Sequence, residues 1–224
     1  MRGEYSGAEV FWYVGGFLAW TPAYLMILWI GWKQRRLEIP VVAATGNIAW
    51  ELIWGFFFSV DMGYGLQNVY RGAFLIDAAI IWFVFRYGRE QTDLPLARRW
   101  YPGLVIGLLA VWGAVVVAMH RTTNVDLPLG STSAYLVNLV ESAVYLWFGL
   151  TVLDPRVMSL VVAWSKGIGT AMVTVFVFLE YPDHDLVRTL AVLVGVIDAA
   201  YIVLLYARRR GHLPVHAAAT AALP

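Results

Sequence analysis

The sequence predicts an all-α polytopic membrane protein with seven transmembrane helices. Three observations lead to this fold class. First, 60% of the 224 residues are hydrophobic and 14% are charged, which is well below the roughly 25% charged residues of soluble domains. Second, apolar runs of about 20 residues, the length that an α-helix needs to cross a bilayer, recur along the chain. Third, basic residues concentrate in alternate connections between these runs.

The apolar runs predict seven spans, at residues 10–32, 40–60, 72–85, 102–119, 134–153, 157–178 and 186–206. The first span follows two acidic residues, Glu4 and Glu9, and no small-residue cleavage site is visible, so we expect it to be retained rather than removed as a signal peptide. The third span is short and is expected to begin near Tyr70. Residues 1–210 should form one transmembrane domain, and residues 211–224 a disordered tail.

The basic residues predict the orientation of the spans. If the N-terminus is outside, the cytoplasmic segments hold eleven Lys and Arg residues and the outer segments hold four, which favours an N-out, C-in arrangement. The net charge of +1 gives no indication of a nucleic-acid partner. Cysteine is absent from the sequence, so disulfides, thiol nucleophiles and Cys-based metal sites are excluded.

A short internal similarity suggests a repeat. Ile76-Asp77-Ala78-Ala79-Ile80-Ile81 in the third span matches Ile197-Asp198-Ala199-Ala200-Tyr201-Ile202 in the seventh at five of six positions. Both spans run inward, which fits a 3+1+3 arrangement of two triple-helix units, as in some transporters. Chance agreement within apolar sequence is the alternative.

Glu51 is the most informative of several polar residues inside the spans. It lies eleven residues after Pro40, which at 1.5 Å per residue is about 16 Å and close to the bilayer midplane. Asn47 shares its helical face, with Trp54 one turn beyond. Asp198 has a similar predicted depth, so we expect the two acids to meet at one cavity. By the same count Asp77 and Glu141 lie nearer the outer side and Lys166 nearer the inner side. Lys166 would either partner one of the acids or extend its ammonium group toward the inner interface.

A carboxyl group inside a membrane has two interpretations. It can be structural, holding two helices together by hydrogen bonds, or it can handle protons. In dry surroundings the charged form is disfavoured, so a buried carboxylic acid can serve as a proton donor. Aromatic rings, such as those of Trp50 and Trp54, would stabilise developing positive charge nearby, although such rings are also routine packing groups. The combination suits carbocation chemistry on an apolar substrate.

Two segments resemble the acidic motifs of a known family. Asn47-Ile48-Ala49-Trp50-Glu51 and the segment around Asp198 are similar to motifs of the small transmembrane terpene cyclases of meroterpenoid and indole-terpenoid pathways, typified by the pyripyropene cyclase. The resemblance implies that Glu51 and Asp198 are catalytic and protonate a terminal epoxide or alkene of a prenyl chain on an aromatic or indole-like head. It also implies that no metal is needed.

The function expected from residues and resemblance together is a proton-initiated terpene cyclase of the isomerase or lyase type, without a cofactor. No Asp-Asp-x-x-Asp box for magnesium diphosphate is visible in the sequence. The partners would be a prenylated, farnesyl-type small molecule and the lipid bilayer, with the oligomeric state left open, and the location a bacterial-type plasma membrane. We expect the substrate-binding residues to be Asn47, Trp50, Trp54, Asp77, Glu141 and Tyr201.

Two other functions compete with the cyclase as interpretations of the sequence. The first is a proton-coupled transporter of small solutes, in which the midplane acids would couple proton binding to solute movement. The second is a seven-helix photoreceptor. Its retinal-linking lysine should lie in the seventh span, which contains Asp198 and no lysine. The photoreceptor is therefore disfavoured, and the transporter remains the alternative.

Overall fold

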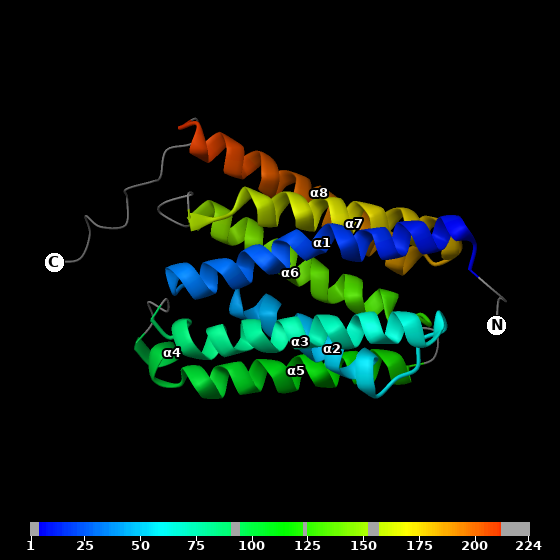
Figure 1. Cartoon of the computed structure of the whole chain (residues 1–224), viewed down its shortest axis with the longest axis horizontal. Coiled ribbons are helices and arrows are strands. Elements are labelled where there is room, and N and C mark those ends of the chain that lie inside the picture. The colour runs from blue at the N-terminus through cyan, green and yellow to red at the C-terminus, as the bar shows by residue number, and fades with distance from the viewer. Residues whose placement is uncertain (1–4, 91–94, 123–124, 152–156, 212–224) are drawn as a thin grey trace.

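The chain folds into a bundle of α-helices (Figure 1). The computed structural model describes residues 5–90, 95–122, 125–151 and 157–211, and no strand occurs within these ranges. The helices are α1 (Gly7–Gln34), α2 (Val41–Phe56), α3 (Gly63–Tyr87), α4 (Pro95–Arg99), α5 (Tyr101–Arg121), α6 (Ser131–Thr151), α7 (Leu160–Glu180) and α8 (Asp185–Arg209). The all-helical fold class is therefore confirmed.

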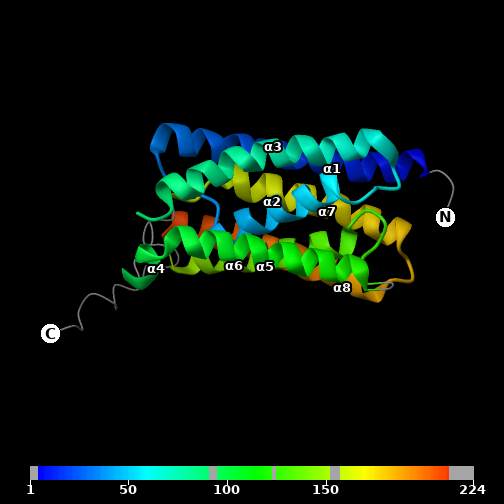
Figure 2. The same cartoon turned by 90° about the horizontal axis from the view of Figure 1, so that it is seen from below.

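The long helices lie side by side, with α2 and α7 in the interior of the bundle (Figures 1 and 2). α1 packs against α7, α2 contacts α3, α5 and α6, and α8 packs on α6 and α7. α1 and α8 run in the same direction, so α1 begins and α8 ends at opposite ends of the bundle (Figure 1). Residues 212–224, which include almost all of the predicted tail, lie outside the described residues.

Six helices of the described chain are long and apolar enough to cross a membrane: α1, α3, α5, α6, α7 and α8. Their outward faces are apolar as well, since Leu18, Leu75 and Val203 are 69%, 67% and 66% exposed. An exposed apolar surface of this extent needs a lipid environment. The chain is thus an integral membrane protein. The second predicted span corresponds to α2, whose 16 residues end at Phe56 rather than at residue 60.

The third helix begins earlier than the hydropathy pattern predicts. α3 starts at Gly63 rather than at residue 72, because its polar first turns bind the end of α2. Gln67 Nε2 donates to the carbonyl of Phe58 at 3.0 Å, and Arg71 Nε donates to that of Gly55 at 2.8 Å. These bonds satisfy carbonyls that the end of a helix leaves without partners. The earlier start also corrects the predicted depth of Asp77, which lies 14 residues into α3, well inside the bundle.

Glycine brings α1 and α7 together. A Cβ atom on Gly169 would lie 2.3 Å from Cδ1 of Trp20, and one on Gly16 would lie 2.4 Å from Cγ2 of Val173. The indole of Trp20 in turn donates from Nε1 to the carbonyl of Lys166 at 3.1 Å. The two helices pack closely because these positions carry no side chain, and this contact forms one wall of the site described next.

Candidate active site

A narrow cavity runs along the interior of the bundle. Its volume is about 120 Å³. Its wall on α1 extends from Tyr13 to Ile27, and its wall on α6 from Ser131 to Tyr145. The first and last residues of each wall are 14 positions apart, which is about 21 Å of helix at 1.5 Å per residue. The cavity is therefore long relative to its volume and suits a linear chain better than a bulky ligand.

Aromatic rings line the half of the cavity nearest the start of α1. They are Tyr13, Phe17 and Trp20 on α1, Trp50 on α2 and Tyr135 on α6. On α1, edge contacts link them in a row, with ring centroids 5.3 Å apart for Tyr13 and Phe17 and 5.4 Å apart for Phe17 and Trp20. The opposite end of the cavity combines the aliphatic side chains of Ala23, Ile27, Ile39 and Val162 with the rings of Tyr24 and Tyr145.

Trp50 is held in place by the connection between α5 and α6. Its Nε1 donates to Oγ of Ser133 at 2.9 Å, and that hydroxyl donates to Oδ2 of Asp126 at 2.6 Å. Asp126 also accepts bonds from the backbone N–H groups of Leu127 and Ser133. Burial raises the pKa of Asp126, and these hydrogen bonds oppose the shift. The indole face is thereby fixed toward the cavity.

Glu51 places a carboxyl group on the middle of the cavity wall. The side chain is 5% exposed, and its Oε2 accepts no hydrogen bond from the described residues. Three other groups act on it from neighbouring helices: the carboxyls of Asp77 on α3 and Glu141 on α6, and the hydroxyl of Tyr24 on α1. None of these is a cation. The acid in contact with Glu51 is therefore Asp77, where the sequence predicted Asp198.

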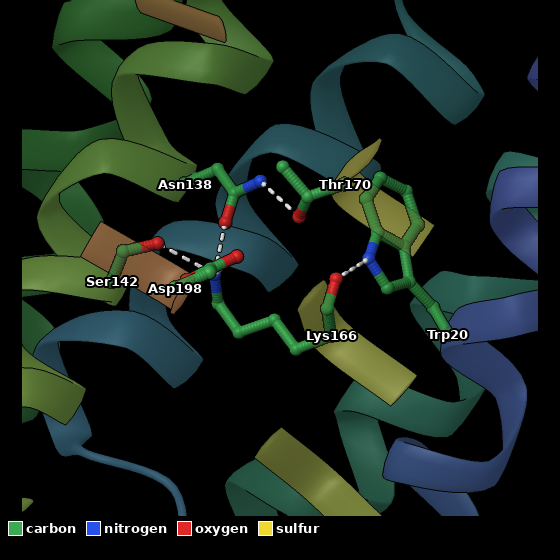
Figure 3. A network of polar contacts seen from close by, with 6 residues as sticks. All are labelled: Trp20, Asn138, Ser142, Lys166, Thr170 and Asp198. Carbon is green, nitrogen blue, oxygen red and sulfur yellow. Dashed lines mark hydrogen bonds and ion pairs between the residues drawn. The ribbon is translucent and has the colours of Figure 1, made fainter. Parts of the chain in front are cut away.

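Asp198 instead belongs to a polar network centred on Lys166 (Figure 3). The Nζ atom of Lys166 lies 2.8 Å and 3.0 Å from the two carboxylate oxygens of Asp198. It also donates to Oδ1 of Asn138 at 2.7 Å and to Oγ of Ser142 at 2.6 Å. The prediction that Lys166 partners one of the intramembrane acids is confirmed. Lys166 lines the cavity, and Asp198 lies behind it.

The predicted site residues divide into those on the cavity wall and those behind it. Asn47, Trp50, Glu51 and Glu141 are on the wall, and the side chains of Asn47 and Glu141 interact with each other. Trp54, Asp77, Asp198 and Tyr201 are not among the lining residues, and each is at most 3% exposed. Tyr201 packs on the ring of Tyr145, with centroids 5.5 Å apart, and so supports the wall from behind.

The aromatic residues of α1 were missed by the sequence analysis. Tyr13, Phe17, Trp20 and Tyr24 follow one another at intervals of four, three and four residues, which places them on one face of a helix. That spacing was a visible signal. Within the described ranges, no group of three or more His, Asp or Glu side chains is placed to bind one metal ion.

The comparisons with known proteins agree with this architecture. The model of the Pyr4-like transmembrane terpene cyclases matches residues 8–210, which is nearly the whole chain. The chain belongs to this family. The family expected from the resemblance is thereby confirmed.

Two named relatives are similar to this chain. Terpene cyclase ascF of Acremonium egyptiacum is 28% identical over 100 residues, which are 44% of this chain and 36% of the relative. The Pyr4-family terpene cyclase mfmH of Annulohypoxylon moriforme is 28% identical over 131 residues, 56% of this chain and 53% of the relative. The matched region thus spans about half or less of each relative's length. No solved structure matches the chain.

These findings also bear on two further expectations. Both relatives are named terpene cyclases, so the comparisons do not support the transporter alternative. Both are fungal, so the comparisons do not support the predicted bacterial-type plasma membrane either.

Proposed function

We propose that this protein is a terpene cyclase that protonates the terminal epoxide or alkene of a prenylated aromatic or indole substrate and so starts a polyene cyclisation. The observation that carries the proposal is Glu51, a buried carboxyl group that opens onto the cavity and whose interacting neighbours, Asp77, Glu141 and Tyr24, include no cation. An ionised carboxylate in such a place would be very costly, whereas a neutral carboxylic acid is a proton donor.

The shape and lining of the cavity support a prenyl substrate. A farnesyl-type chain is linear and apolar, and the cavity is long, narrow and mostly apolar. Trp50 and the row of rings on α1 line the same cavity as Glu51. As the cationic centre moves away from the protonated end of the chain, these rings would stabilise it by cation–π attraction, worth about 2 kcal/mol or more in a desolvated site.

Asp198 has a different role from Glu51 in this proposal. Its carboxylate forms a buried ion pair with the ammonium group of Lys166. Asp198 therefore does not supply the starting proton in this proposal; it compensates the positive charge of Lys166, which lines the cavity and would otherwise repel the cationic intermediates. Asn47 and Glu141, which are on the wall, would contact the substrate. No step of this account requires a metal ion.

We also propose a membrane topology for the chain. We infer seven spans with the N-terminus outside, counting α2, since its 16 residues, about 24 Å long, lie inside the bundle. Lys33 at the end of α1 and Arg208 and Arg209 at the end of α8 lie at the same end of the bundle, which fits a cytoplasmic face there. The 3+1+3 repeat has one supporting feature: Asp77 and Asp198 each face a polar residue on the preceding helix.

Product analysis tests the proposal. Purified protein in detergent is incubated, without added metal, with 3-farnesylindole, 2-farnesylhydroquinone and the terminal epoxides of both, and the products are separated and weighed by mass spectrometry. We expect at least one new product with the mass of its substrate and fewer double bonds by NMR. If every probe is recovered unchanged while proteoliposomes show proton-driven solute uptake, the proposal is wrong.

A further inference from the structure

The strongest feature outside the mechanism above is the carboxyl group of Asp77. Its side chain is 1% exposed in the middle of α3, and it does not line the cavity. Neither of its oxygens accepts a hydrogen bond from an N–H or hydroxyl group of the described residues. A buried carboxylate left without a donor is among the most expensive arrangements in a protein.

A hydrogen bond between the carboxyl groups of Asp77 and Glu51 would remove the free-energy cost of burying Asp77 without a partner. The carboxyls of Asp77 and Glu51 lie within hydrogen-bonding reach of each other, and Oε2 of Glu51 likewise lacks a donor. Two carboxylates in contact repel each other, whereas a protonated carboxyl donates an O–H bond to its neighbour. The titratable groups that face the pair are Tyr24 from α1 and Glu141 and Tyr145 from α6, and none of them carries a positive charge. The contact is therefore stable only if the pair holds protons.

We propose that Asp77 is a positioning residue that holds Glu51 in its protonated form and then stabilises the Glu51 carboxylate that the reaction creates. This inference rests on the proposed function of Glu51 as the donor. Both carboxyls are neutral before the reaction. The O–H bond of Glu51 breaks, a bond forms between that proton and the epoxide oxygen or alkene carbon, and Asp77 donates its own O–H to the Glu51 carboxylate. Overall charge is conserved, because the new carboxylate balances the new carbocation.

The return of the proton completes the cycle. When the last carbocation of the cascade forms an alkene or is captured by a hydroxyl or amine of the head group, one proton is released, and it restores the neutral pair. Lys166 and Asp198 cannot perform this exchange in the same way, because their pair is already a fixed ion pair. In this proposal the buried acids have two different roles: Glu51 and Asp77 are protonated before the reaction, whereas Asp198 forms an ion pair with Lys166.

Kinetics of two Asp77 variants test the proposal. In Asp77→Leu the Glu51 carboxylate keeps the hydroxyl of Tyr24 but loses the donor that Asp77 supplies. We therefore expect kcat to fall about tenfold or more while KM changes little, because Asp77 does not line the cavity. In Asp77→Asn the amide N–H donates to Glu51 at all times and favours its ionised form. Activity should therefore persist at low pH, where Glu51 is still protonated. As the pH rises, activity should be lost at a lower pH than in the unmodified protein.

Asp183→Asn, a change of the same kind in the exposed turn before α8, is the matched control and should leave kcat and the pH profile unchanged. A purely structural role for Asp77 would reduce the amount of folded protein without moving the pH profile. Unchanged kcat in Asp77→Leu together with an unchanged pH profile in Asp77→Asn would overturn the proposal.

Infrared difference spectroscopy tests the pair without any substrate. The protein at neutral pH should show the band of a protonated carboxyl group, shifted in D₂O, that weakens in both Glu51→Gln and Asp77→Asn and is unaffected in Asp183→Asn. If the two variants leave the band as it is, the shared protons do not exist and the inference fails. If the band behaves as expected but no prenylated probe is cyclised, the proposed function fails and the protonated pair stands.

Discussion

The ammonium group of Lys166 lies 2.8 Å from Oδ1 of Asp198, and both side chains are buried where α6, α7 and α8 meet. Asn138 and Ser142 accept the remaining N–H bonds of the ammonium group. Every donor on Lys166 therefore has a partner, which is the condition under which a buried ion pair is tolerated. The pair joins α7 to α8, and its network extends to α6.

Breaking this pair should be more harmful than removing it. Lys166→Met or Asp198→Leu alone leaves one buried charge without its counter-ion, which costs about 3–5 kcal/mol. The double variant leaves no charge, so its loss should be smaller than the sum of the two single losses. Thermal unfolding in detergent, followed by circular dichroism, gives the comparison. Strictly additive losses would mean that the two charges do not interact.

The contact between α1 and α7 should depend on Gly169. The new Cβ atom in Gly169→Ala would lie 2.3 Å from the ring of Trp20, so one helix or the ring must move, at a cost of about 1–3 kcal/mol. Gly195→Ala on α8 is the matched control, because nothing lies within 4 Å of its Cβ position, and it should be neutral or slightly stabilising. The unfolding temperatures of the two variants test this expectation. Equal values would contradict the close packing of α1 against α7.

Glu38 should make stability depend on pH. This residue precedes α2, is 2% exposed and accepts a 2.5 Å bond from the backbone N–H of Ser159, and burial raises its pKa from 4.5 to about 7. Between those two pH values the folded state holds a proton that the unfolded state has released. Stability should therefore fall as pH rises through this window, by on the order of 3 kcal/mol.

Unfolding temperatures measured between pH 5 and 8 test this dependence. Glu38→Gln should flatten the decline, because glutamine does not titrate. Glu90→Gln, at an exposed position after α3, should keep the decline and serves as the control. An identical decline in the protein and in Glu38→Gln would show that another group is responsible.

The fold class was predictable because a bilayer imposes a length on every apolar helix that crosses it. The beginning of α3 was not, since Gln67 and Arg71 interrupt the apolar pattern. Their side chains bind carbonyls of Gly55 and Phe58, and only the packed structure reveals those partners. A hydropathy window therefore shortens the helix at its polar end.

The site was predictable in its residue types and only partly in its pairing. Counting residues along a helix gives the depth of Glu51, but depth alone does not say which neighbouring helix faces it. Asp198 was expected beside Glu51 at matching depth, whereas α3 presents Asp77 there and α7 presents Lys166 to Asp198. The direction in which each helix turns its polar face is set by packing, as at Gly16 and Gly169. That direction cannot be predicted from a single sequence.

The most direct test of the central claim is the rate of product formation by Glu51→Gln. Glutamine keeps the size and hydrogen-bonding shape of the side chain and removes the proton that the reaction needs. With whichever prenylated probe the unmodified protein cyclises, we expect mass spectrometry to show a loss of about 100-fold or more in Glu51→Gln and none in Asp183→Asn, at equal amounts of folded protein. Full turnover by folded Glu51→Gln would contradict the account.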